Sequence, residues 1–350
     1  MIFIFALRST MSEIKHNPPP TALPILGLAL LQKELQAKSR FANYGDRICT
    51  GCADIDDHVL GGGGFERGIV VGVNGLDDIG RLIAYNAVAS VALSNLTSST
   101  PTRKALIIDI SGNFSVQLLS HIIRSRLLSS KLLDPSLAPE KLEEQVISCL
   151  ETIDIDTVFD ITGLWEVLGS LSGGSAKVSE MEIVFIDNLG VLISSLLSDK
   201  TEAYDLLSTL CKSNSSPILL TLVALTHQAK TLIRLAHDLN ILFILRVVAS
   251  TSTYAHEKTN PPYLTSIFAS NAIAPALGRT FDQFVELHVL VGCVGDAGEN
   301  PVTVIEVLKD EAPDLGAERR GLGSREQRWA PVAVAAGEMV LVGMLMEGDG

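Results

Sequence analysis

The amino-acid sequence predicts an α/β fold, in which a doubly wound and mostly parallel sheet carries helices on both faces. From Ile48 onward, short β-branched runs alternate with segments whose apolar residues recur at helical spacing, which is typical of parallel βαβ units. The 350 residues are 47% hydrophobic, which is enough for a large buried core. Because ligands of such sheets bind at the carboxyl ends of the strands, a functional site is expected there.

Seven strands are predicted from short apolar runs, of which 182–187 is the clearest because it closes on a carboxylate. They are residues 69–73, 105–109, 153–159, 182–187, 241–248, 284–291 and 302–308. Helical spacing of apolar residues predicts helices at 80–93, 116–128 and 225–239. Patches rich in serine and glycine at 168–175 and 212–216 predict surface loops.

Residues 1–46 are predicted to be an N-terminal extension and residues 47–350 a single core domain. The extension contains the linker Pro18 to Pro20 and one short amphipathic helix from Leu23 to Leu35, too little for a separate domain. That helix is interpreted as a tether to a neighbouring subunit, and packing on its own core is the alternative. Met1 and Met11 are both candidate start residues.

The charge balance argues against strong DNA binding by the isolated chain. With 27 basic and 40 acidic residues the net charge is −13, so any contact with DNA must be local or shared with a partner. The mean hydropathy of +0.33 fits a large core, and it also fits apolar surface that another subunit covers. The sequence shows no apolar run of bilayer-spanning length, so no membrane partner is expected.

The five cysteines are scattered, which suits a reducing compartment better than a disulfide framework. Cys49 and Cys52 form a C-x-x-C, but the sequence offers no second pair and no nearby histidine cluster. No zinc site is therefore predicted.

Residues Gly75 to Leu82 have the frame of the phosphate-binding motif G-x-x-x-x-G-K-[ST] with its last two positions changed. Gly75 and Gly80 retain the frame, so backbone N–H groups could still meet a phosphate. Arg81 keeps a positive charge but not the compact ammonium of lysine, and Leu82 cannot ligate Mg²⁺. Weak binding of ATP and Mg²⁺ is the expectation. An ordinary strand-turn-helix is the alternative, and a Rossmann loop fits less well because the G-x-G spacing is missing.

Three acidic residues bear on this loop. Asp77 and Asp78 bring negative charge toward it, at a cost of about 3 kcal/mol each at roughly 5 Å and an effective dielectric constant of about 20, unless they point outward. Asp187 ends the clearest strand and is the candidate to hold Mg²⁺ through water.

The order of segments between Ile48 and Val307 resembles the RecA-type recombinases, and in particular the eukaryotic recombinase paralogs that assist filament assembly. The most specific stretch is Ile48 to Asp56 followed by Gly61 to Gly64, which looks like the family's approach to its phosphate loop. Residues Ile108 to Phe114 are similar to the family's Y-I-D-T-E-G-T-F segment, and Pro275 to Phe281 to its P-A-L-G-x-x-W/F segment. The resemblance implies a RecA-like core with a P-loop.

The resemblance also implies several site residues. Ser111 stands at the catalytic glutamate position, and a hydroxyl is a poor base near neutral pH. Leu245 to Val248 replaces the family's T-N-Q-V, which puts its nucleotide sensor in doubt. The segment Ser250 to Ala274 corresponds to a DNA-facing loop, in which Lys258 and Tyr263 are candidates for contact with single-stranded DNA.

A second basic cluster, with Trp329 beside it, is the other candidate for DNA contact. Its members are Arg319, Arg320, Arg325 and Arg328. Such arginines often pair with neighbouring carboxylates instead, so this reading stays open.

Together these features predict a nuclear DNA-repair protein of homologous recombination. It would be a mediator that joins other recombinase-fold subunits in a hetero-oligomer, resembling the yeast-type paralog of a heterodimer, and would assist filament assembly on single-stranded DNA. The substitutions at Arg81, Leu82 and Ser111 predict weak or absent ATP hydrolysis. The alternatives are a functional DNA-dependent ATPase of the same fold, or a metabolic P-loop transferase, for which no substrate pocket is visible in the sequence.

Overall fold

A computed structural model describes most of the core. The described residues are 47–75, 78–97, 104–129, 139–172, 180–192, 229–251, 266–268, 273–275, 279–295, 301–312, 325–334 and 341–344. By internal contacts the chain divides into Met1–Asn43 and Tyr44–Gly350, and all elements below belong to the second unit. The predicted extension at 1–46 lies outside the described residues.

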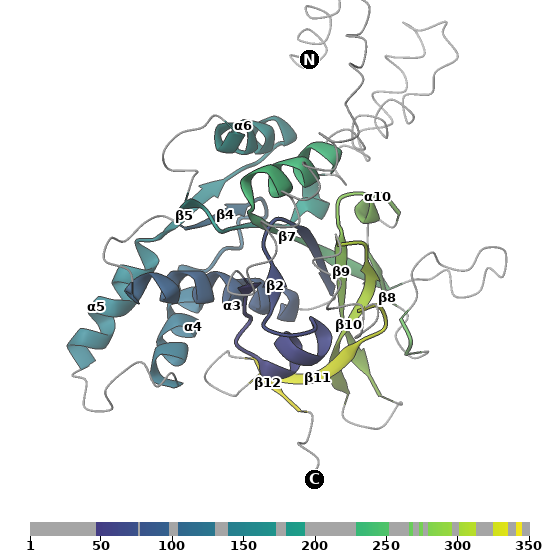
Figure 1. The fold of residues 1–350 in the computed structure, drawn as a ribbon, viewed down its shortest axis with the longest axis horizontal. Coiled ribbons are helices and arrows are strands. Elements are labelled where there is room, and N and C mark those ends of the chain that lie inside the picture. Colours follow the sequence, from purple (N-terminus) through teal and green to yellow (C-terminus); the bar gives the residue numbers. More distant parts are fainter. Residues whose placement is uncertain are drawn as a thin grey trace, which may run out of the picture. The chain divides into compact units, whose positions relative to one another are not determined.

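A large twisted sheet forms the centre of this unit (Figure 1). Six neighbouring strands are parallel, in the order β5-β4-β6-β7-β3-β9. Their bounds are β3 Val70–Gly75, β4 Ala105–Asp109, β5 Ile153–Thr157, β6 Ile183–Asp187, β7 Leu242–Thr251 and β9 Leu287–Val294. The short strand β8 (Ile273–Pro275) pairs antiparallel with the end of β7.

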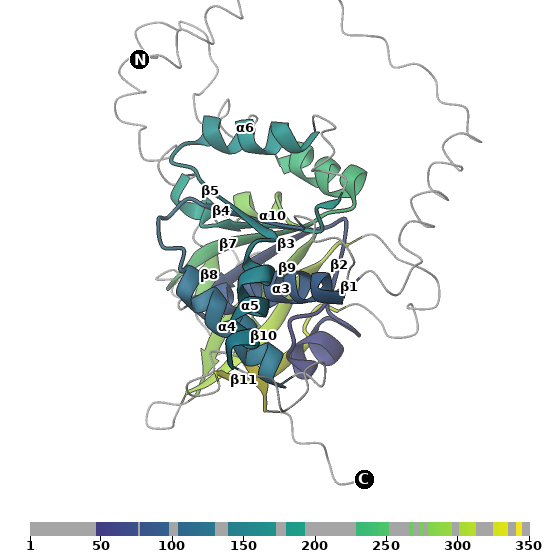
Figure 2. The same cartoon turned by 90° about the vertical axis from the view of Figure 1, so that its left-hand side faces the viewer.

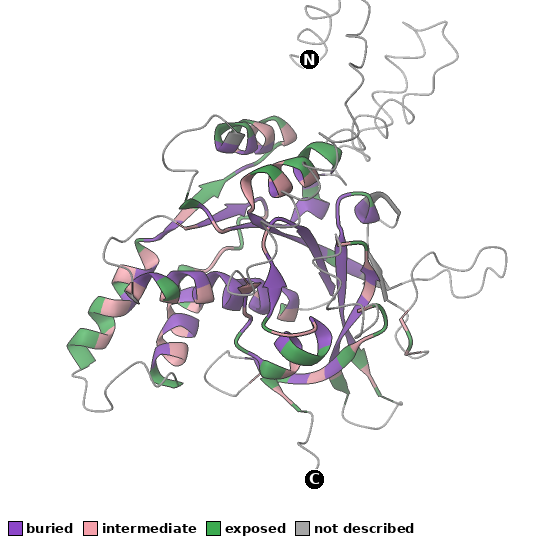
Figure 3. Cartoon of the chain, viewed as in Figure 1, coloured by how far each residue is buried: buried purple, intermediate pink, exposed green. Residues whose placement is uncertain are grey.

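Helices cover both faces of the parallel strands (Figure 2). One face carries α3 (Ile79–Ser94), α4 (Val116–Ser129) and α5 (Pro139–Leu150), and the other carries α6 (Ile161–Ser172) and a helix at 229–239. Because successive strand residues point to opposite faces, Val71 and Val73 join one buried cluster while Val70 joins the other. Figure 3 shows the central strands buried from both sides. The predicted doubly wound α/β fold is confirmed.

The sheet continues beyond β9 with antiparallel strands, of which the last two were not predicted from the sequence. They are β10 (Val302–Asp310), β11 (Trp329–Val334) and β12 (Leu341–Gly343). Strand β10 was predicted, but its antiparallel direction was not. The π-helix η1 (Asp54–Val59) contacts β11 and β12, and a hairpin of β1 (Arg47–Ile48) and β2 (Phe65–Glu66) adjoins it.

The other predicted elements agree with the structure within a few residues, with one exception. The patch at 168–175 was predicted to be a surface loop, but its first part is the end of α6. In α6 the apolar residues Leu164, Leu168 and Leu171 are buried against the sheet, and their spacing outweighs the low helix propensity of the glycine between them. The patch at 212–216 lies outside the described residues.

Candidate functional site

The candidate site lies at the carboxyl ends of β3, β4, β6 and β7. The glycine-framed loop joins β3 to α3, and of its residues Leu76 and Asp77 lie outside the described part. A Cβ atom on Gly75 would lie 3.0 Å from Cβ of Val291 in β9, and one on Gly80 would lie 3.2 Å from Cγ1 of Val73. Gly75 therefore permits the close approach of β3 and β9, and Gly80 that of α3 and β3.

Arg81, in the first turn of α3, is directed at Asp187. Its Nε donates a hydrogen bond to Oδ2 of Asp187 at 2.7 Å, and the two side chains are 12% and 3% exposed. Burial alone would lower the pKa of Arg81, but the charge of Asp187 and the hydrogen bond it accepts raise that pKa above its ordinary value. Arg81 is therefore a permanent cation paired with the carboxylate.

Arg246 occupies the other oxygen of the same carboxylate. Its Nη1 donates to Oδ1 of Asp187 at 2.8 Å, and its side chain is 7% exposed. The pair arises from strand register, because Arg246 in β7 lies directly beside Asp187 at the end of β6. Arg246 lies in the segment Leu245 to Val248 that replaces T-N-Q-V, but its pairing with Asp187 was not predicted. A usable signal was present, since an arginine in an otherwise apolar buried strand needs a carboxylate partner on a neighbouring strand.

Asp78 completes a cluster with these three residues. Its Oδ1 accepts a hydrogen bond from Nη1 of Arg81 at 2.9 Å and a longer one from Nη2 of Arg246 at 3.5 Å. The Asp78 side chain is 72% exposed, so this corner of the cluster contributes little to stability. Asp78 was expected to burden the loop with negative charge, but here that charge is matched by Arg81.

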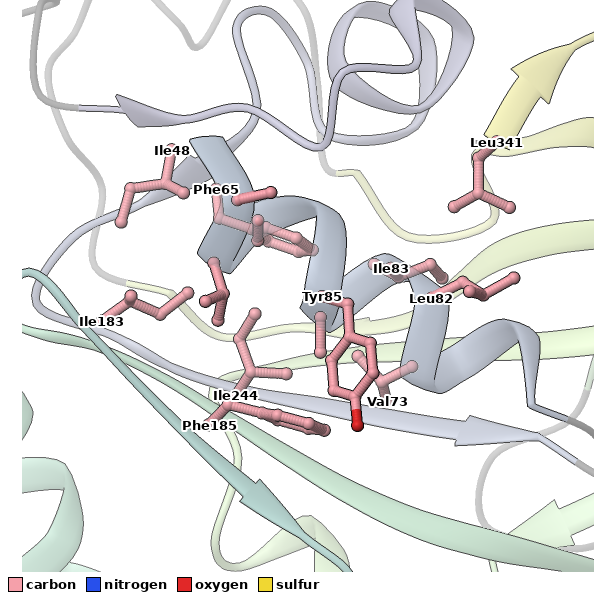
Figure 4. Packing of buried hydrophobic residues seen from close by; sticks show 14 of the residues in the cluster. Ile48, Phe65, Val73, Leu82, Ile83, Tyr85, Ile183, Phe185, Ile244 and Leu341 are labelled. Atoms are coloured by element: carbon pink, nitrogen blue, oxygen red, sulfur yellow. The ribbon is translucent and has the colours of Figure 1, made fainter. Parts of the chain in front are cut away.

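Leu82 contributes packing and no ligand. It is 4% exposed and belongs to the core cluster that fills the space between α3 and the sheet (Figure 4). The position where a phosphate loop carries a metal-binding hydroxyl is thus part of the hydrophobic core.

The side chains of Ser111 and Asp109 are hydrogen-bonded to each other, and Asp109 also binds the backbone of the turn that follows β4. The Asp109 carboxylate accepts hydrogen bonds from backbone N–H groups of Ser111, Gly112 and Phe114 at 3.1, 2.9 and 3.0 Å. The Ser111 hydroxyl donates to Oδ1 of Asp109 at 3.2 Å. This hydroxyl, at the position that the resemblance assigns to a catalytic glutamate, therefore holds the local turn.

These residues do not fit a complex of Mg²⁺ with a nucleotide. Mg²⁺ requires a nearly octahedral shell of oxygen ligands. Both oxygens of Asp187 already accept hydrogen bonds from guanidinium groups, Asp109 accepts hydrogen bonds from three backbone N–H groups, and Leu82 has no donor atom.

The predicted DNA-contacting residues Lys258, Tyr263, Arg319 and Arg320 lie outside the described residues. Of the second basic cluster, Arg325 and Arg328 are described. The side chain of Arg325 is 11% exposed. It donates hydrogen bonds to Glu66 at 2.7 Å and to Asp310 at 2.7 Å. For Arg325 the alternative reading holds, since it is paired with carboxylates instead of lying open to a phosphate.

The end of the predicted DNA-facing loop is anchored on the antiparallel strands. Glu306 of β10, which is 1% exposed, accepts hydrogen bonds from the Ser266 hydroxyl at 2.6 Å and from the backbone N–H of Ile267 at 2.8 Å. The ring of Phe268 packs edge-on against that of Trp329, with 5.0 Å between the ring centroids. These contacts hold residues 266–268 of that loop against β10 and β11.

The strand order and the glycine-framed loop after β3 place the chain in the class of RecA-like α/β folds. The crystal structure of the RadB recombinase is similar to it, with a TM-score of 0.51 and 18% sequence identity over 85% of this chain and 100% of that one. At this identity the similarity shows the fold alone. No protein-family model and no curated protein matches the sequence. In the described part of the chain, no helix is long and apolar enough to cross a membrane.

Proposed function

We propose that this chain is a recombinase-fold mediator of homologous recombination, which works in the nucleus with little or no hydrolysis of ATP. The observation that carries the proposal is the state of Asp187, because both of its carboxylate oxygens accept hydrogen bonds from arginine side chains. A RecA-like core whose acidic strand end is neutralised in this way retains the shape of a recombinase subunit without the chemistry of phosphoryl transfer.

The partners proposed are other recombinase-fold subunits and single-stranded DNA that is shared with them. The net charge of −13 supports the sharing, since a chain of this charge attracts the phosphate backbone poorly by itself. The fold supports the choice of partners, because it is similar to that of a protein described as a recombinase.

ATP turnover tests the catalytic part of the proposal. The purified protein is expected to hydrolyse ATP no faster than the Asp187→Ala variant, with or without single-stranded DNA. Turnover that exceeds the variant's and rises with DNA would contradict the proposal and establish the alternative, a DNA-dependent ATPase.

Filament assembly tests the mediator part. A recombinase that co-purifies with this chain from cells with damaged DNA should form filaments on single-stranded DNA faster when the chain is added. An unchanged assembly rate over a range of chain concentrations would remove the mediator role, whatever the result of the turnover assay.

A further inference from the structure

The cluster at the candidate site connects three separate elements. Arg81 belongs to α3, Asp187 ends β6 and Arg246 lies in β7. The three side chains are at most 12% exposed, and the two short hydrogen bonds to Asp187 measure 2.7 and 2.8 Å. The Asp187 carboxylate pairs with an arginine on each side, and these two ion pairs connect α3 and β7 to the end of β6.

The charge of the Asp187 carboxylate is already neutralised within the cluster. A carboxylate buried at a strand end needs a cation, and a divalent metal ion is one way to supply it. Here two guanidinium groups supply the charge, each in a fixed planar geometry that matches a carboxylate oxygen. A metal ion approaching Asp187 would meet two positive charges, and each carboxylate oxygen already accepts a hydrogen bond from an arginine.

We infer that Arg81 and Arg246 are an internal replacement for the metal and the nucleotide: they hold α3, β6 and β7 together without a ligand and exclude Mg²⁺–ATP from Asp187. This inference goes beyond the proposed function. It concerns what neutralises Asp187 and shares that observation with the proposed function, but its tests do not depend on any part in recombination.

The test compares the Arg246→Gln variant with a matched control. Arg124→Gln also removes one arginine from a carboxylate, but its pair with Glu143 lies on the surface between α4 and α5. The Arg246→Gln variant should melt roughly 5 to 10 °C below the natural protein, because it leaves a buried charge half-compensated. The Arg124→Gln control should melt within about 2 °C of the natural protein. Equal melting of the two variants would overturn the inference.

Mg²⁺ provides the second arm. Millimolar Mg²⁺ without nucleotide should recover part of the melting temperature lost in Arg246→Gln, relative to the same variant in a chelator, and should leave the natural protein unchanged. An Arg246→Gln variant that Mg²⁺ does not stabilise would show that the arginines form a structural ion pair only, and the replacement of a metal would be refuted.

A third arm uses the natural protein and does not depend on the folding of any variant. Titration with a fluorescent ATP analogue should give the same weak signal in Mg²⁺ and in a chelator. Mg²⁺-dependent binding that Asp187→Ala weakens tenfold or more would overturn the inference. Failure of the mediator assay with all three of these outcomes as expected would remove the proposed function and leave the internal replacement standing.

Discussion

Leu82 stands where a phosphate-binding loop carries a hydroxyl, and its side chain packs between α3 and the sheet. Its burial in the core cluster shows that here the side chain contributes to folding. The motif frame in the sequence identified Leu82 and Arg81 as substitutions. It could not show that Arg246 compensates for them, because that contact depends on the register of two strands far apart in the chain.

Restoring the hydroxyl at this position should destabilise the protein. Leu82→Thr removes buried methyl groups and buries a polar one, so we expect a loss of about 2 to 4 kcal/mol in the free energy of unfolding. Denaturant titration measures it, with Leu128→Thr as the control, because Leu128 is 66% exposed on α4. The control should change by less than about 0.5 kcal/mol. Similar losses in the two variants would contradict the core role of Leu82.

The hairpin of β1 and β2 is joined to the antiparallel end of the sheet by buried charges. Glu66 accepts hydrogen bonds from Arg47 and from Arg325, and Arg325 also pairs with Asp310 of β10. Burial raises the pKa of Glu66 although Arg325 opposes the shift. Strands β1 and β2 have only two residues each, so few backbone hydrogen bonds hold them. The ion pairs therefore add a connection between these strands and β10.

Removing Arg325 should therefore be costly. Arg325→Met leaves Asp310 and one side of Glu66 without their cation, and the expected loss is about 3 kcal/mol or more in the free energy of unfolding. Chemical denaturation of Arg325→Met measures this loss, with Arg124→Gln as the control. The exposed ion pair of Arg124 should contribute at most about 1 kcal/mol. If the two variants lose equal stability, the Arg325 network is not a structural connection.

The helix at 229–239 meets the start of β9 through a titratable pair. Nε2 of His237 lies 2.8 Å from Oε1 of Glu286, whose other oxygen accepts the backbone N–H of Val70 at 3.1 Å. The hydrogen bond to Glu286 raises the pKa of His237, outweighing burial, which lowers it. When His237 is protonated, the two side chains form an ion pair.

This pair should make stability depend on pH in a defined direction. A raised folded-state pKa means that the stabilisation is complete below about pH 6.5, the unfolded value, and is lost as the pH rises through the folded value. The difference in melting temperature between the natural protein and His237→Gln should then narrow from pH 6 upward. A difference that widens with pH would give the opposite sign and exclude the pair as its cause.

At the scale of the whole molecule, the net charge of −13 bears on the proposed binding of DNA. We expect the isolated chain to bind single-stranded DNA weakly, and its complex with a partner to bind more tightly with a steeper dependence on salt. Fluorescence anisotropy with labelled oligonucleotides at several salt concentrations measures both. Nanomolar binding by the chain alone in physiological salt would refute the shared-site idea and direct attention to Arg319 and Arg320.

Local patterns predicted the parallel part of the sheet well, because each strand is an apolar run bounded by helical spacing. The antiparallel strands β11 and β12 were not predicted. Residues Trp329 to Val334 mix exposed and buried side chains, and Leu341 to Gly343 is too short to show a pattern. The candidate site divides in the same way. Arg81, Leu82 and Asp187 follow from the motif and the strand end, and Asp78 from its place in the loop. The pairing of Arg246 with Asp187 appears only in the three-dimensional contacts.

The position of β3 has a consequence for how the chain folds as it is synthesised. Its two neighbours come late in the sequence, since Val70 pairs with Phe243 of β7 and Val71 with Leu287 of β9. An emerging chain therefore makes this apolar strand long before either partner exists, and contacts of such long sequence separation form slowly. During that interval β3 has two unpaired edges that can associate with other chains. Protection by a chaperone during translation would then govern the yield of soluble protein more strongly than the stability of the finished fold.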